Sequence, residues 1–82
     1  MKDILSLFVD DIEDIKFFDI NYFVLSNTDD WFRRSRIIKC IKEDVKMTFP
    51  LYGSENKLHD GNHRIRVLKD LGYKKVPVKM KF

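Results

Sequence analysis

The sequence contains only one cysteine, Cys40, so no disulfide can form within the chain, and no metal-site spacing surrounds this residue. A disulfide-stapled secreted domain is therefore excluded, and a reducing, cytoplasmic location is expected. Long apolar runs are also missing. None approaches the roughly 20 residues that a membrane-spanning helix needs, so we expect no membrane partner. The first residues turn acidic after a short apolar patch and offer no small-residue cleavage site, which argues against a signal peptide.

Glycine and proline are scarce, with three and two residues, and no Gly-, Ser- or Pro-rich linker divides the chain. A length of 82 residues supports one domain, which we place at residues 1–82. The sequence is 44% hydrophobic and 35% charged, which is typical of a folded protein rather than a disordered one. Seven Phe, three Tyr and one Trp supply the bulk that a small core needs.

Charge is distributed unevenly along the chain. Residues 1–30 contain eight acids and two lysines, whereas residues 31–82 contain fourteen bases and five acids. A basic second part suits ligands that carry phosphate. The alternative is that two oppositely charged halves simply complement each other within one fold, and the sequence leaves both explanations open.

The order of predicted elements is strand, helix, β-hairpin, helix and strand. This order indicates a compact α/β (α+β) domain with a small mixed sheet and two main helices. Residues 12–25 are rich in β-forming Ile, Phe, Tyr and Val. Residues 31–46 carry an apolar stripe at helical spacing that includes Trp31 and Val45.

The second half of the chain gives clearer boundaries. Residues 47–60 alternate as two strands around a GSEN loop at 53–56. A helix with a buried stripe that includes Leu71 should then begin at residues 61–62 and close at a left-handed Gly72. The last strand is expected over residues 76–80, where apolar and polar residues alternate.

The densest polar cluster, Asp60-Gly61-Asn62-His63-Arg64, lies where the predicted hairpin meets the second helix. Free amides and the helix dipole make such a start an anion site, and Gly61 allows a sharp turn and the close approach of a ligand. Arg64 offers a planar fork for phosphate oxygens, and His63 can donate to phosphate or carry a proton. Asp60 could hold Mg²⁺ or accept a proton. The alternative is that the cluster merely caps a helix.

Residues 57–80, KLHDGNHRIRVLKDLGYKKVPVKM, resemble the core motif of the ParB/sulfiredoxin-like superfamily, in which a strand ends in an Asp-Gly-x-His-Arg box that opens a helix. The resemblance implies that Gly61, Asn62, His63 and Arg64 contact the phosphates of a nucleotide. It also implies that Asp60 is functional, as in kinase-like relatives, with Mg²⁺ and ATP or CTP as cofactors. Asn62 stands where sulfiredoxins have their catalytic cysteine, so reduction of sulfinic acids is not expected.

Two classes of function follow as expectations. The first is a nucleotide-dependent enzyme that catalyses phosphoryl transfer or phosphodiester cleavage, with Asp60 and His63 as catalytic residues and Asp60 as a metal ligand. The second is a non-catalytic protein of the phage or mobile-element type that docks onto DNA or a nucleic-acid-binding host protein. The oligomeric state is left open.

Two further features leave alternatives open. A general base in the acidic N-terminal part can be suggested by charge alone; the candidates are Asp10, Asp11, Glu13, Asp14 and Asp19. The run Trp31-Phe32-Arg33-Arg34 mixes aromatic and basic residues, as proteins that bind single-stranded nucleic acid do. A helix start with one buried aromatic is the simpler explanation of this run.

Overall fold

The computed structural model describes residues 2–9, 11–25 and 30–80, and it contains a four-stranded mixed sheet with two α-helices. In the sheet, β1 is antiparallel to β4, β4 is parallel to β2, and β2 is antiparallel to β3. The predicted compact α+β arrangement, with a small mixed sheet and two helices, is therefore confirmed. The strands are β1 (Ile15–Asp19), β2 (Leu51–Ser54), β3 (Lys57–Asp60) and β4 (Lys75–Met80).

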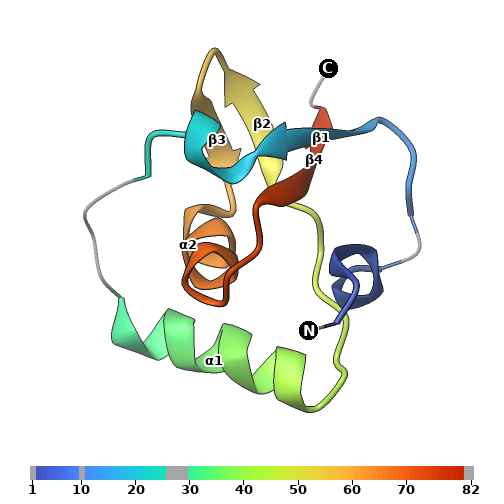
Figure 1. Ribbon diagram of the computed structural model, residues 1–82, viewed down its shortest axis with the longest axis vertical. Coiled ribbons are helices and arrows are strands. Elements are labelled where there is room, and N and C mark those ends of the chain that lie inside the picture. The colour runs from blue at the N-terminus through green and yellow to red at the C-terminus, as the bar shows by residue number, and fades with distance from the viewer. Residues whose placement is uncertain (1, 10, 26–29, 81–82) are drawn as a thin grey trace.

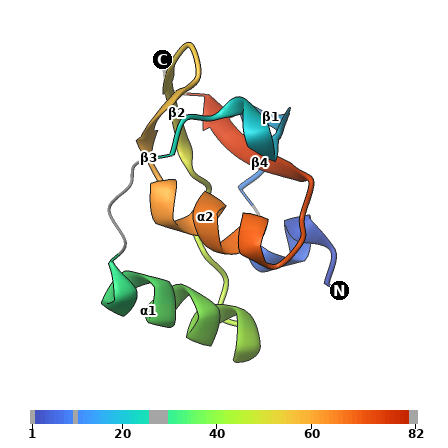
Figure 2. The same ribbon diagram turned by 60° about the vertical axis from the view of Figure 1, so that its left-hand side comes forward.

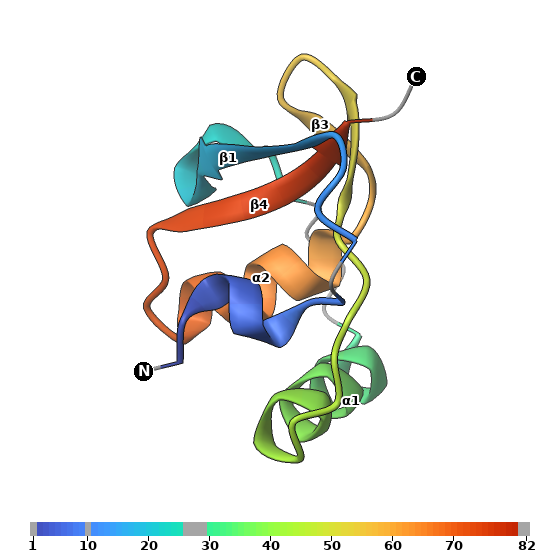
Figure 3. The same ribbon diagram turned by 90° about the vertical axis from the view of Figure 1, so that its right-hand side faces the viewer.

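The helices lie on one side of the sheet and form two further layers (Figures 1 and 3). The helix α2 (Asn62–Asp70) and the short 3₁₀ helix η1 (Ile4–Leu7) lie next to the sheet, and α1 (Trp31–Lys42) packs on α2. The first turns of α1 and α2 lie on the same side of the molecule (Figure 2). No helix within the described ranges combines the length and the apolar character that a membrane crossing requires.

The core forms between the sheet and the layer of α2 and η1. Ile65 and Leu68 of α2 and Val76 and Val78 of β4 are completely buried, together with Phe8 from the segment after η1. A helical stripe and an alternating strand each present one apolar face, and burying these two faces against each other drives the packing.

The N-terminal segment is a structural part of this core. Phe8 forms an isolated parallel bridge with Met47, in which Met47 N–H donates to Leu7 and Val9 N–H donates to Met47, both at 2.9 Å. The Phe8 ring stacks on Phe49 with a centroid distance of 4.8 Å. Residues far apart in the sequence thus close the end of the core beside η1.

The strand predicted over residues 12–25 is too long. Only Ile15–Asp19 is a strand, and the chain then turns into the 3₁₀ helix η2 (Ile20–Tyr22). The Asp19 carboxylate accepts a hydrogen bond from Asn21 N–H at 2.8 Å. Such a side-chain cap competes with continued strand pairing, so the β-forming composition of residues 20–25 does not decide the backbone here.

The first helix is shorter than predicted, and its apolar stripe is placed incorrectly. It ends at Lys42, and Asp44 follows with a left-handed φ of 57°. Trp31 and Val45, expected in the buried stripe, are exposed. The reason is that α1 packs mainly on α2, so only its second half, at Ile37, Cys40 and Ile41, lies partly buried against the core.

The second half of the chain follows the prediction more closely. The first strand of the hairpin was predicted from residue 47 but begins only at Leu51, and the loop is tighter than predicted, since residues 53–54 belong to β2 and the turn lies at residues 55–56. The helix α2 closes at Gly72, whose φ is +100°, as expected. Gly72 N–H donates to Lys69 and Tyr73 N–H to Leu68, which is a Schellman closure. Leu71, expected to be buried, is exposed because it lies at the C-cap.

Candidate functional site

The predicted box lies where β3 ends and α2 begins. Asp60 is the last residue of β3, Gly61 is the N-cap, and Asn62 opens α2. Gly61 is buried with a φ of +100°, and an added Cβ would lie 2.6 Å from Pro50 Cβ. The sequence suggested that this glycine leaves room for a ligand. The structure instead fills that side with Pro50, so the glycine serves the turn and the close packing of the chain.

The first turn of α2 offers amide donors to solvent or a ligand. No side chain caps the helix at Gly61, and the first intrahelical bond of the turn joins Ile65 N–H to the Gly61 carbonyl at 3.1 Å. The N–H groups of residues 62–64 precede this bond, so the helix provides them with no partner. Together with the helix dipole, they favour an anion at this position.

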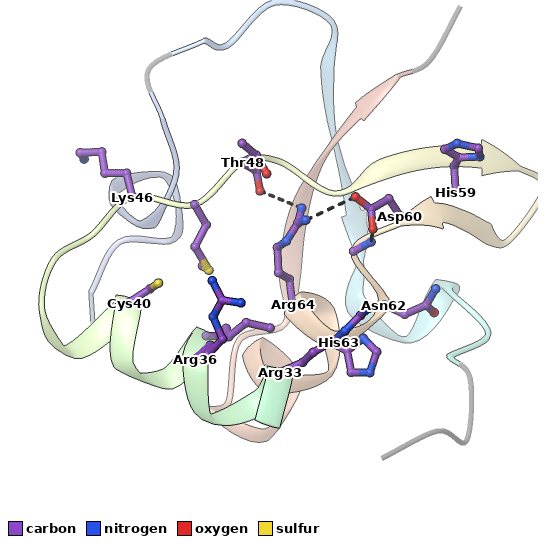
Figure 4. A pocket seen from close by; sticks show the side chains of 13 residues that line it. Arg33, Arg36, Cys40, Lys46, Thr48, His59, Asp60, Asn62, His63 and Arg64 are labelled. Atoms are coloured by element: carbon purple, nitrogen blue, oxygen red, sulfur yellow. Dashed lines mark hydrogen bonds and ion pairs between the residues drawn. The ribbon is translucent and has the colours of Figure 1, made fainter. Parts of the chain in front are cut away.

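A cleft of about 550 Å³ opens beside this helix start (Figure 4). Its walls come from the first turns of α1, from residues 46–48, from the end of β3 and from the start of α2. We call it the basic cleft, because among the described residues one carboxylate, Asp60, lines it against four cationic side chains: Arg33, Arg36, Lys46 and Arg64.

Arg64 is fixed in the wall of the basic cleft. Its guanidinium donates one hydrogen bond to the Thr48 carbonyl at 3.0 Å and another to Asp60 Oδ2 at 3.4 Å (Figure 4). The Arg64 side chain is only 20% exposed. A guanidinium has five N–H donors, so these two bonds leave donors for an oxyanion while they restrict the orientation of the group.

Asp60 joins the helix start to Arg64. Its Oδ1 accepts a hydrogen bond from Gly61 N–H at 2.9 Å, and its Oδ2 lies 3.4 Å from the Arg64 guanidinium. The side chain is 61% exposed, so water or a cation can still reach it. No group of three or more His, Cys, Asp or Glu residues within the described ranges could hold a metal. Asp60 could therefore give a metal ion one carboxylate oxygen ligand, without a cage of further His, Cys, Asp or Glu side chains from the described residues.

Asn62 and His63 also line the basic cleft, but His63 does not meet Asp60. Figure 4 shows the His63 ring apart from the pair formed by Asp60 and Arg64. Its Nε2 is shut off from solvent and has no hydrogen-bond partner among the described residues. Two residues with predicted catalytic roles therefore border one cleft without direct contact.

Three of the four cationic side chains in the cleft were not predicted to belong to this site: Arg33, Arg36 and Lys46. Of these, the sequence drew attention only to Arg33, in the aromatic and basic run of residues 31–34. Arg33 forms an ion pair with Asp30 at 3.4 Å, and Lys46 donates to the Ser6 carbonyl at 3.0 Å. In the described part of the chain, Arg36 has no carboxylate within ion-pair distance. The basic composition of residues 31–46 was the available signal, but only the packing of α1 on α2 shows which bases face the box.

Among the described acidic residues of the N-terminal part, Asp11 lines a cavity that also reaches Asp60 of the box. This smaller cavity of about 200 Å³ shares Thr48 and Asp60 with the basic cleft. Asp11 forms an ion pair with Lys79 at 2.5 Å, and this hydrogen bond is the main reason why the pKa of Asp11 is lowered. A carboxylate with a lowered pKa is a weaker general base. Asp10, another candidate base, lies outside the described residues.

The chain matches no family model, no curated protein and no solved structure. The assignment of a function therefore depends on the chemistry of the basic cleft.

Proposed function

We propose that this domain binds the phosphates of a nucleotide in the basic cleft. The observation that supports the proposal most directly is the excess of positive charge at an uncapped helix start: four cationic side chains and one carboxylate line a space of about 550 Å³. This volume is in the range of known ligand pockets, roughly 300–1,000 Å³. Like charges gathered in one place repel one another, and a bound anion relieves this repulsion.

Each group then has a distinct part in binding. The amides of Asn62, His63 and Arg64 would donate to one phosphate, whereas Gly61 N–H already donates to Asp60. The Arg64 guanidinium, held by Thr48, would donate to the same phosphate with its remaining N–H groups. Arg36, on the opposite wall, would meet the next phosphate along (Figure 4).

The donor set suits Mg²⁺ only as an ion that arrives with the phosphates. Mg²⁺ is commonly held by one or two carboxylates together with phosphate oxygens and water, and in the described part of the chain Asp60 is the one carboxylate that lines the cleft. When bound there with ATP or CTP, Mg²⁺ would neutralise charge that develops on the phosphates.

In phosphoryl transfer or phosphodiester cleavage, Asp60 would be the proton acceptor. Asp60 would take the proton of an attacking hydroxyl or water while the phosphate is held by the amides and Arg64. The attacking oxygen would form the new bond to phosphorus as the P–O bond on the opposite side breaks and the nucleotide or nucleic-acid oxygen leaves. We assign this step to Asp60 rather than His63, because the free nitrogen of His63 is closed off from solvent. Asp11 is unsuited to it, since Lys79 holds its pKa low.

Calorimetric titration with ATP, CTP and pyrophosphate, with and without Mg²⁺, tests the binding proposal. A charge-assisted hydrogen bond contributes about 1.5–3 kcal/mol, so Arg36→Gln and Arg64→Gln should each weaken binding about 10- to 100-fold. Lys39→Gln is the matched control, since Lys39 is an exposed base on α1 that does not line the cleft. Binding that responds equally to all three variants would refute a specific site. If none of the three ligands binds, the competing class of docking proteins is favoured.

A further inference from the structure

Two aromatic side chains at the start of α1 are exposed to solvent. Trp31 is 76% exposed and Phe32 is 63% exposed, although a helix start with one buried aromatic was the simpler expectation. Large exposed apolar side chains that adjoin a polar site often mark a binding surface. The position of each ring relative to the basic cleft decides which of them belongs to it.

Phe32 extends the basic cleft, whereas Trp31 does not. The guanidinium carbon of Arg36, which lines the cleft, lies 6.0 Å from the centroid of the Phe32 ring. Trp31 lies about 100° around the helix axis from Phe32, on the side away from Arg36. The wall of the cleft therefore continues into a flat aromatic face beside a cation, which is the pairing that stacks nucleobases next to phosphates.

The basic cleft is open along its length. Most of its charged and polar wall is exposed to solvent, including Arg33, Arg36, Lys46, Thr48 and Asp60. Sites for small molecules enclose 70–90% or more of the ligand, and their walls are mainly apolar. An open wall rich in bases suits a polymer that keeps one side in water and spreads its charge over several phosphates.

We infer that the ligand of the basic cleft is a single-stranded nucleic acid, with its phosphates between Arg36 and Arg64 and an unpaired base stacked on Phe32. This inference rests on the proposed function, because it requires the same phosphate site. It adds the class of ligand and a base-stacking position. A base within a duplex has both of its faces covered by neighbouring bases, so the ring selects for an unpaired one.

The test compares four ligands by fluorescence anisotropy, direct or by competition: pyrophosphate, thymidine monophosphate, an oligothymidylate of about ten residues, and a duplex of equal length. Phe32→Leu keeps the apolar bulk and removes the flat ring, and Trp31→Leu is the matched control on the neighbouring residue. Stacking on an aromatic ring should make the loss of oligothymidylate binding in Phe32→Leu roughly 5- to 100-fold. Pyrophosphate binding should stay unchanged in Trp31→Leu, and in Phe32→Leu it should change far less than oligothymidylate binding, because Phe32 meets the phosphate site only through Arg36.

The outcomes separate this inference from the proposed function. The oligothymidylate should bind more tightly than the monophosphate and the duplex. For each phosphate contact, its affinity should fall by about 0.7 log units when the salt concentration rises tenfold, and Arg36→Gln should remove about one such contact. If pyrophosphate binds but the strand gains nothing over the monophosphate, or if Phe32→Leu and Trp31→Leu behave alike, the inference fails while the phosphate site stands. If the duplex and the single strand bind equally well, the claim that the site selects unpaired bases is wrong. If no ligand binds, both proposals fail.

Discussion

Pro50 lies directly against Gly61, so that a Cβ at Gly61 would be 2.6 Å from Pro50 Cβ and 2.8 Å from Pro50 Cα. The contact joins the segment before β2 to the start of α2, and it holds the box residues in place beneath the basic cleft. Since Pro50 Cα belongs to the backbone, it cannot move aside as the end of a flexible side chain can. The position is therefore closed to any residue other than glycine without a shift of the chain.

Gly61→Ala should destabilise the domain by more than the left-handed backbone alone explains. A left-handed non-glycine residue costs about 1–2 kcal/mol, and the collision with Pro50 adds to that cost. Gly72→Ala is a matched control, because Gly72 has the same φ of +100° but is exposed to solvent. Urea unfolding should show a clearly larger loss of unfolding free energy for Gly61→Ala. Equal losses would show that Pro50 is not a steric limit.

The stacked pair Phe8 and Phe49 gives a prediction about the N-terminal segment. Phe8 is completely buried, so Phe8→Ala should lower the free energy of unfolding by about 3–5 kcal/mol. Small domains have only about 5–15 kcal/mol in total, and the variant should therefore be largely unfolded at moderate temperature. Phe17→Ala, at a largely exposed ring, should cost far less. The melting temperatures of both variants can be measured by circular dichroism. If the two substitutions lowered the melting temperature by similar amounts, Phe8 would not be a core residue.

Local signals explain what the sequence could predict. The box at the start of α2 and the closure at Gly72 depend on backbone geometry over a few residues, and both lie where they were expected. The exposure of Trp31 and the arrival of Arg36 at the box depend on how α1 packs on α2. Helical periodicity shows that one face of a helix is apolar, but it does not show how much of that face a neighbour covers. The wall of the basic cleft that α1 contributes could therefore not be predicted from the sequence.

The ion pair between Asp11 and Lys79 predicts a pH dependence of stability. Lys79 lowers the pKa of Asp11 in the folded state, and the Glu13 N–H contributes further. The unfolded value is about 4, so the stabilisation is present above it and disappears as the pH falls through the lower folded value. Asp11 in turn raises the pKa of Lys79, with Asp14 and Glu13 adding to the effect. That contribution is present below about pH 10 and is lost at higher pH.

Asp11→Asn should therefore lower the melting temperature at about pH 7, and the difference from the unaltered protein should shrink towards about pH 3. Thermal melts across this range measure the difference directly. Asp19→Asn is a useful comparison, because an asparagine oxygen at position 19 can still accept the hydrogen bond from Asn21 N–H. A gap between Asp11→Asn and the unaltered protein that stays constant with pH would mean that the carboxylate charge is not the source of the effect.

Asp60→Asn should separate the charge of the box from its geometry. Asparagine keeps an oxygen for Gly61 N–H but removes the negative charge of Asp60, which no other described residue supplies in the lining of the basic cleft. In EDTA, pyrophosphate should bind about fivefold more tightly to the variant, because one unit charge near the anion has been removed. With Mg²⁺ present, the unaltered protein should gain affinity and the variant should gain much less, since the carboxylate ligand is missing. If Asp60→Asn instead weakens binding without metal, the carboxylate acts by holding Arg64 in place, and the metal role assigned to Asp60 loses its support.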